Sequence, residues 1–341
     1  YFDWRSWVLY ETNQIKFLRN ISDSLIAYFP FNGNANDESV FANNGTVIGA
    51  SLTFDRYANA DNAYNFNGVS DRIYVPDNSI YDFSFGDFTM TAWINIANIN
   101  TGRIVSSGYN ENDNIWGLGF GTNPDWGTGK RINYFVYSNN NYRDFSSNEI
   151  TDYSTGVWTF VTATKINDQI RFYQNGLPVG ETTINYPSNS NSYMSIGCRQ
   201  VTSNSFIEFL NGKIDEVKIF NTSFTAQQIN GMYLATTTAP VLIFPVNNSA
   251  IDTLQPTFDW DSTVTATYYN IVVSTDSTFT TLILDQNTYS SSYQIASGLL
   301  QPNIKYFWKV RTINEGGIGP WSEVYNFRTL LTDVEDETQL P

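Results

Sequence analysis

The 341-residue sequence contains no histidine and only one cysteine, Cys198. Histidine is the most frequent general base and a common zinc ligand, so its absence removes much of the usual chemistry of hydrolases. Ser-His-Asp and Cys-His mechanisms are therefore excluded. A single cysteine also excludes a disulfide within the chain, and with it a fold held together by disulfides.

Basic residues are scarce, with 18 Lys and Arg against 33 Asp and Glu and a formal net charge of −15. A chain this acidic is repelled by phosphate backbones, so we exclude nucleic acid as a partner. The sequence has no apolar run of ~18 or more residues, and we expect no membrane span. The excess of negative charge is instead compatible with recruitment of cations.

Aromatic residues make up 16% of the chain and charged residues only 15%, a balance typical of strand-rich proteins. Apolar and polar residues alternate in Phe88–Ile96, where the even positions form one apolar face. Strand Ile170–Tyr173 leads to Asn175-Gly176, a pair that favours a tight hairpin turn. These patterns predict an all-β protein.

Similar patterns recur along the chain and change in character near residue 236. Further strands are predicted at Leu25–Phe31, Ala63–Phe66, Arg72–Val75, Ile104–Ser107, Ile115–Phe120, Arg131–Val136, Trp158–Thr164, Tyr193–Gly197 and Gly212–Phe220, and a short helix capped by Thr225 at Thr225–Leu234. After the small polar segment 236–240 the strands become shorter. We therefore expect an N-terminal extension (1–21), a first sandwich (22–235), a linker (236–240), a second sandwich (241–330) and an acidic tail (331–341).

The first sandwich carries an ordered set of motifs. They are Leu25–Ser39, Asn44–Thr46, Phe66–Gly68, Phe88–Trp93, Phe172–Gly176 and Gly212–Val217. Together they resemble the laminin-G-like, concanavalin A-like domains. The resemblance implies a jelly-roll sandwich of two curved sheets, a structural Ca²⁺ and a glycan- or protein-binding role.

The residues around Asp215 point to the same cation. Asp215 has the strand parity of Val217 and Ile219, so an inward valine and isoleucine imply an inward carboxylate. An ionised carboxylate in that position needs a partner, and this face of the strand carries no basic residue. Bound Ca²⁺ with oxygen ligands from loops would satisfy it.

The remaining Ca²⁺ ligands are implied by the resemblance alone. It places them in the loop from Pro30 to Asp37 and at the turn of Gly68, with Asp37 as the second side-chain ligand. The alternative is that Asp215 accepts backbone N–H groups and that Asp37 is a turn residue chosen for its Asx geometry.

A catalytic role is not expected. Glucanases with this type of sandwich place acidic residues on alternate positions of one strand, because acid and nucleophile lie ~5–5.5 Å apart in retaining enzymes. The sequence has no Glu-x-Asp-x-Glu cluster, and the adjacent Asp215 and Glu216 would face opposite sides of a strand. We therefore expect a protein that is not an enzyme.

Saccharide sites pair flat aromatic rings with amides and charged groups. The loop Gly121–Lys130 places Trp126 among small polar residues, as a ligand-binding loop would. Other candidates in nearby segments are Tyr109, Asn110, Trp116, Tyr142 and Arg143. The alternative is that Trp116 belongs to the core with Leu118 and Phe120, and that Trp126 covers the edge of the sandwich.

The second sandwich resembles a fibronectin type III domain. The resemblance rests on Pro256–Trp260, Leu300–Val310 and Gly319–Ser322. It implies a core Trp260 and a tyrosine corner at Tyr306, in which the hydroxyl binds nearby backbone. Trp321 is predicted to pack over Arg311 and Lys309.

The two ends of the chain suggest its setting. Val334–Pro341 resembles the acidic linker before the sorting domain of bacterial type IX-secreted proteins. Within residues 1–20, Trp4, Trp7, Val8, Leu9 and Tyr10 are too apolar for a free linker, so this segment either packs on the sandwich or self-associates with a neighbouring molecule. We expect an extracellular or cell-surface binding or adhesion protein whose partner is a glycan or cell-surface ligand. The alternative is a structural subunit of a filament or surface layer.

Overall fold

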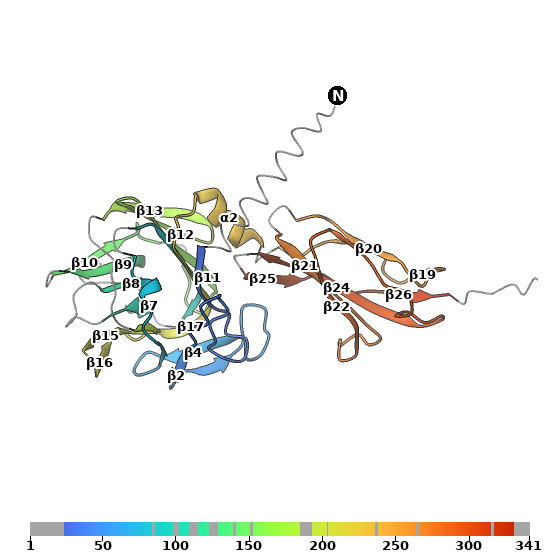
Figure 1. The fold of residues 1–341 in the computed structure, drawn as a ribbon, viewed down its shortest axis with the longest axis horizontal. Coiled ribbons are helices and arrows are strands. Elements are labelled where there is room, and N and C mark those ends of the chain that lie inside the picture. Colours follow the sequence, from blue (N-terminus) through green and yellow to red (C-terminus); the bar gives the residue numbers. More distant parts are fainter. Residues whose placement is uncertain are drawn as a thin grey trace, which may run out of the picture. The chain divides into compact units, whose positions relative to one another are not determined.

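The computed structural model describes residues 24–83, 86–97, 102–108, 115–122, 129–138, 141–150, 153–184, 193–202, 204–235, 238–263, 266–314 and 317–330. Within these ranges nearly all regular structure is β-strand, and one α-helix is present. The chain divides into two compact units between Asn230 and Gly231 (Figure 1). The predicted all-β class is confirmed.

The first unit contains two large sheets, which form a jelly-roll-like sandwich. The eight-stranded sheet has the spatial order β13 (Leu177–Thr183), β12 (Gln169–Gln174), β11 (Thr159–Ile166), β6 (Phe88–Ile96), β17 (Asn211–Phe220), β4 (Ala63–Asn67) and β3 (Ser51–Thr53), with β1 (Leu25–Phe29) also paired to β17. The seven-stranded sheet has the order β10 (Asn141–Ser146), β9 (Arg131–Ser138), β8 (Ile115–Gly121), β7 (Gly102–Ser107), β14 (Met194–Ile196), β5 (Arg72–Val75) and β2 (Thr46–Ile48). The smaller elements are the hairpin of β15 (Arg199–Thr202) and β16 (Ser205–Ile207) and the 3₁₀ helix η1 (Ser79–Tyr81), and the division between the two units falls within the helix α2 (Ala226–Ala235).

The core of the first unit follows the period-two pattern of its strands. The even positions of β6, from Phe88 to Ile96, are all buried and belong to one apolar cluster with residues of both sheets. Each such side chain contributes roughly 1.5–3 kcal/mol when it leaves water. Alternation therefore fixes which face of each strand is left for other roles.

Helix α2 begins where the sequence predicts it. The Thr225 hydroxyl accepts a hydrogen bond from the Gln228 backbone N–H at 3.3 Å, and the Gln228 side-chain oxygen accepts one from the Thr225 N–H at 2.7 Å. This reciprocal pair satisfies two N–H groups that a helix start leaves unpaired. Ile229 is fully buried and anchors the helix.

The second unit is a smaller sandwich. One sheet has the order β18 (Leu242–Phe244), β20 (Thr257–Trp260) and β23 (Ser292–Gln294), and the other β19 (Ser249–Ile251), β26 (Tyr325–Thr329), β24 (Lys305–Asn314), β21 (Tyr268–Ser274) and β22 (Leu282–Thr288), with β25 (Gly317–Trp321) paired to β24. Across both units, no described helix is long and apolar enough to cross a membrane.

Three side-chain predictions for the second unit are confirmed. Trp260 is 1% exposed and belongs to the apolar core. The Tyr306 hydroxyl accepts a hydrogen bond from the Gln301 backbone N–H at 2.8 Å, which is the tyrosine corner. The ring of Trp321 lies 4.4 Å from the Arg311 guanidinium and 4.5 Å from the Lys309 ammonium.

Candidate functional site

The predicted inward orientation of Asp215 is wrong, because β17 contains a bulge. Glu216 has a φ of 52°, and the pairing of β17 with β6 shifts between Asp215 and Lys218. One extra residue at a bulge reverses the parity of the strand. Asp215 consequently lies on the same face as Lys218, opposite Trp93 of β6 and away from the core residue Val217.

The partner of Asp215 is an arginine from a distant loop. Arg56 Nη1 donates to Asp215 Oδ2 at 2.8 Å, and Nη2 lies 4.0 Å from Glu216 Oε1. Glu216 also accepts from Lys218 Nζ at 2.9 Å. Burial disfavours the charged form of Glu216, but Lys218 and then Arg56 outweigh it and lower the pKa of that carboxyl. The two acidic residues thus share one guanidinium instead of facing opposite sides of the strand.

The residues predicted to bind Ca²⁺ do not fit a common ion. The Asp37 carboxylate already accepts hydrogen bonds from the backbone N–H groups of Tyr28, Ser39 and Asn43 and from the Ser39 hydroxyl. Asp37 is therefore the turn residue of the alternative interpretation. No group of three or more acidic or cysteine side chains suited to a metal ion occurs among the described residues.

Two further predicted ligands lie in different surroundings. Gly68 follows Asn67, which pairs with Asn211, four residues before Asp215 along β17. At ~3.3 Å per residue this is a separation of roughly 13 Å. Pro30 follows Phe29, which pairs with Val217, so it lies near the bulge and away from Gly68. Pro30 and Gly68 consequently do not join Asp215 in one donor set.

The predicted saccharide residues separate into three groups. Tyr109, Asn110 and Trp126 lie outside the described residues. Trp116 is fully buried, with its indole N–H donating to the Tyr81 carbonyl at 3.0 Å, so it cannot face a ligand, and the core alternative holds. Of the remaining two residues, Tyr142 joins a cluster on the outer face of the seven-stranded sheet.

Arg143 does not share that face. It pairs with the core residue Val136, whereas Tyr142 pairs with Tyr137, and neighbouring residues of a strand point to opposite faces. The Arg143 side chain is exposed, and its Nη1 donates to the Tyr142 carbonyl at 3.1 Å. The predicted pairing of Tyr142 with Arg143 in one site is therefore wrong.

Arg103 of β7 is the centre of the cluster. Its side chain is 1% exposed, and it donates to the Glu208 carboxylate at 2.7 Å from Nε, to the Tyr142 hydroxyl at 2.6 Å from Nη2, and to the Asn133 side-chain oxygen from Nη1. The guanidinium also lies 4.3 Å from the centre of the Phe135 ring. Strands β9 and β10 and the segment after β16 thereby converge on one cation of β7.

Glycines on β8 make room for this arrangement. β8 reads Ile115–Gly121, with core residues alternating with Gly117, Gly119 and Gly121. A Cβ on Gly119 would lie 2.6 Å from Asn133 Oδ1 and 2.9 Å from Arg103 Nη1, and one on Gly117 would collide with the Phe135 ring. The outer face of β8 therefore carries no side chains at Gly117 and Gly119, and Phe135, Asn133 and Arg103 from the neighbouring strands occupy that space.

The remaining members of the cluster are charged. Arg199 lies 3.6 Å from Glu208 and packs its guanidinium 4.6 Å from the Tyr142 ring. Asp144 lies 3.9 Å from Arg103, and burial raises the pKa of Asp144 to about 6 despite that neighbour. Burial likewise raises the pKa of Tyr142, which keeps its hydroxyl protonated.

This cluster, here called the Arg103 cluster (Arg103, Asn133, Phe135, Tyr142, Asp144, Arg199 and Glu208), is a fixed array of hydrogen-bonding groups around two aromatic rings. Phe135 and Tyr142 stack with centroids 5.6 Å apart at 26°. Tyr142 and Glu208 remain partly exposed at its rim. Such an array can recognise hydroxyl-rich ligands without reorganising. Sequence reasoning found only Tyr142, although the alternating glycines of β8 pointed to bulky neighbours on that face.

Two family models match the chain. Residues 66–230 match the Laminin_G_3 model, described as the Concanavalin A-like lectin/glucanases superfamily. Residues 245–333 match the model of the Rha78A-like, N-terminal immunoglobulin domain. The predicted concanavalin A-like sandwich and the immunoglobulin-like sandwich are confirmed, whereas fibronectin type III membership and type IX secretion stay predictions.

The solved structures to which the chain is similar include three of different origin. Domain 4 of AbnA, an extracellular arabinanase from Geobacillus stearothermophilus in complex with arabinotriose, is 16% identical over 61% of this chain and 97% of that chain, with a TM-score of 0.48. The binding domain of botulinum neurotoxin serotype D/C is 14% identical over 85% and 72%, with a TM-score of 0.47. A pentraxin from Limulus polyphemus is 19% identical over 50% and 80%, with a TM-score of 0.38. No curated protein matches the chain.

Proposed function

We propose that the first unit is a non-catalytic glycan-binding module and that the Arg103 cluster is its binding face. The observation that carries the proposal is the immobilised Tyr142, whose hydroxyl is held by Arg103 and whose ring is packed by Phe135 and Arg199 while part of it stays exposed. The lectin-type family match over residues 66–230 supports the same function. The proposed setting is the cell surface or the extracellular medium.

The chemistry of the rim suits a saccharide. A sugar ring offers apolar C–H faces and hydroxyl edges, which match an aromatic ring beside charged hydrogen-bonding groups. Tyr142 offers its ring and hydroxyl, and Glu208, which pairs with Arg103, offers carboxyl oxygens as hydrogen-bond acceptors. The network behind them fixes both side chains, so little conformational entropy is lost on binding.

Affinity electrophoresis of the full chain through gels containing soluble plant and bacterial polysaccharides tests the proposal. Tyr142→Ala is expected to raise the Kd obtained from the retardation by about tenfold or more, as truncation of a central aromatic contact does. Arg143→Ala is the matched control, since its exposed side chain points to the other face. Absence of retardation by every polysaccharide, or equal retardation of the two variants, would refute the assignment.

Hydrolysis of the polysaccharide is the alternative function that must be distinguished from binding. Asp144 and Glu208 both contact Arg103, and the raised pKa of Asp144 is a property shared with catalytic acids. Release of reducing ends from the retarding polysaccharide should not exceed that of a blank. The alternative of a filament or surface-layer subunit rests on residues 1–20, outside the described ranges, and stays a prediction.

A further inference from the structure

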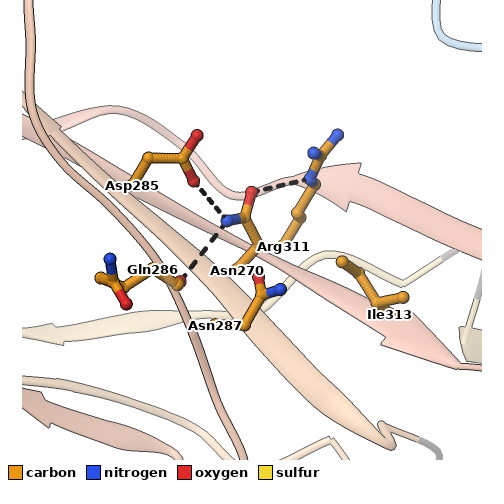
Figure 2. A pocket seen from close by; sticks show the side chains of 6 residues that line it. All are labelled: Asn270, Asp285, Gln286, Asn287, Arg311 and Ile313. Atoms are coloured by element: carbon orange, nitrogen blue, oxygen red, sulfur yellow. Dashed lines mark hydrogen bonds between the residues drawn. The ribbon is translucent and has the colours of Figure 1, made fainter.

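The second unit has a polar groove on the outer face of its larger sheet. Its volume is about 500 Å³, within the range of small-ligand sites. It is lined by Asn270 of β21, by Asp285, Gln286 and Asn287 of β22, and by Arg311 and Ile313 of β24 (Figure 2). The side chains of Asp285 and Asn287 share the outer face with Asn270, whereas Gln286 pairs with the core residue Ile271 and offers the groove its backbone carbonyl.

Asn270 fixes the polar wall of the groove. This side chain is buried, and its amide nitrogen donates to Asp285 Oδ1 at 2.7 Å and to the Gln286 carbonyl at 3.4 Å. Its amide oxygen accepts from Arg311 Nε at 3.2 Å, and Figure 2 shows this amide between the carboxylate and the guanidinium. A carboxylate, an amide and a guanidinium are thereby held in one row, as preorganised recognition requires.

Apolar surface adjoins this row. The guanidinium of Arg311 lies 4.4 Å from the centre of the Trp321 ring, on the strand paired with β24. Ile313 lines the groove two residues further along β24. Polar groups thus stand beside both an aliphatic and an aromatic side chain, the combination that sugar rings satisfy with hydroxyl edges and C–H faces.

The charges of the groove select the class of ligand. An anion would meet the carboxylate of Asp285, and a cation would meet the guanidinium of Arg311. A neutral hydroxyl-rich molecule accepts from the guanidinium and donates to the carboxylate, and the amide of Asn287 offers both functions. We propose that this groove is a second ligand site, specific for a neutral saccharide and independent of the Arg103 cluster.

Fluorine NMR of the full chain labelled with 5-fluorotryptophan tests this proposal, because Trp321 packs against Arg311 of the groove and reports on its occupancy. The chain has nine tryptophans, and Trp321→Phe identifies the Trp321 resonance by its loss. Cellotetraose, xylotetraose, mannotetraose, laminaritetraose and arabinotriose are titrated in turn. The expected result is a saturable shift of the Trp321 resonance with at least one of them. No shift with any of the five would overturn the proposal.

Variants assign the response to the groove. The double substitution Asp285→Ala and Asn287→Ala should raise the Kd of the oligosaccharide that shifts the Trp321 resonance by about tenfold or more. Both side chains are exposed and line the groove. Gln294→Ala, an exposed polar substitution on the other sheet, should leave the titration unchanged. An equal loss in Gln294→Ala, or no loss in the double variant, would overturn the assignment.

A third variant separates this site from the one proposed in the first unit. Tyr142→Ala alters the Arg103 cluster and should leave the Trp321 titration intact. If the Trp321 response disappears with Tyr142→Ala, the groove is not an independent site. If it persists while polysaccharide gels retard Tyr142→Ala as strongly as the native chain, the glycan function of the first unit fails and the groove stands.

Discussion

Arg56 and Asp215, 159 residues apart in the chain, form a buried ion pair on the outer face of the eight-stranded sheet. Arg56 Nη1 lies 2.8 Å from Asp215 Oδ2, and the side chains are 6% and 3% exposed. The same guanidinium lies 4.8 Å from the Trp93 ring. A protein cation therefore neutralises the carboxylate for which the sequence predicted a metal ion.

Removal of this cation should be costly. Arg56→Met leaves Asp215 buried without its partner, and loss of one member of a buried pair costs about 3–5 kcal/mol. Urea unfolding followed by circular dichroism measures the loss. Arg171→Met is the control, because its pair with Glu181 is 42% and 59% exposed and is worth about 1 kcal/mol or less. Equal losses in both variants would show that Arg56 is not an essential partner.

Calcium should not stabilise the protein through Asp215. The melting temperature in calcium and in chelator is expected to be the same for the native chain, because Arg56 already pairs with this carboxylate and Asp37 is fully engaged with backbone donors. Differential scanning calorimetry measures it. A calcium-dependent rise that Asp215→Asn abolishes would restore the predicted metal site.

Asp144 should make stability depend on pH. Its ordinary pKa of 3.8 is raised by burial to about 6, so the folded state holds the proton more tightly than the unfolded chain. Stability is therefore lost as pH rises from about 4 through about 6, by an amount on the order of 3 kcal/mol. Asp144→Asn does not titrate, so its stability relative to the native chain should rise over this interval.

The pH experiment has a matched control. Asn148→Ala removes an exposed, non-titrating side chain of the same unit and should keep a constant difference from the native chain between about pH 4 and about pH 6. Chemical denaturation at several pH values gives each difference in free energy. A flat difference for Asp144→Asn would contradict the assigned burial of this carboxyl.

The contribution of the tyrosine corner to the stability of the second unit can be measured by removing one oxygen atom. Tyr306→Phe removes the hydroxyl that accepts from the Gln301 N–H, at a cost of about 1 kcal/mol. Tyr289→Phe, at a site 86% exposed, should change stability by less than about 0.5 kcal/mol. Equal unfolding free energies of the two variants would deny the corner its stabilising role.

The sequence predicted what depends on local pattern. The alternation in β6 and the cap of Thr225 are encoded within a few residues, and both occur as expected. The predicted orientation of Asp215 is wrong because β17 has a bulge at Glu216. Glu216 is not a glycine, and the bulge leaves no mark on the apolar–polar pattern of the sequence. Period-two reasoning is reliable only while the register holds.

The candidate site depended on contacts that no local pattern encodes. Arg103 reaches Asn133, Tyr142 and Glu208, which are 30, 39 and 105 residues away in the chain. Such partners are chosen by the pairing order of β7 to β10 and by the segment after β16. Composition suggested aromatics and amides for binding, but only the fold showed which of them meet.

The central claim is that the outer face of the seven-stranded sheet binds a glycan, and calorimetric titration tests it most directly. The ligand is the polysaccharide that most strongly retards the native chain in the gel. Its Kd is measured for the native chain, for Gly119→Ala and for Arg143→Ala. A Cβ at Gly119 displaces Arg103 and Asn133, so the Kd should rise about tenfold or more, while Arg143→Ala should match the native chain. An unchanged Kd for a folded Gly119→Ala chain would contradict the claim.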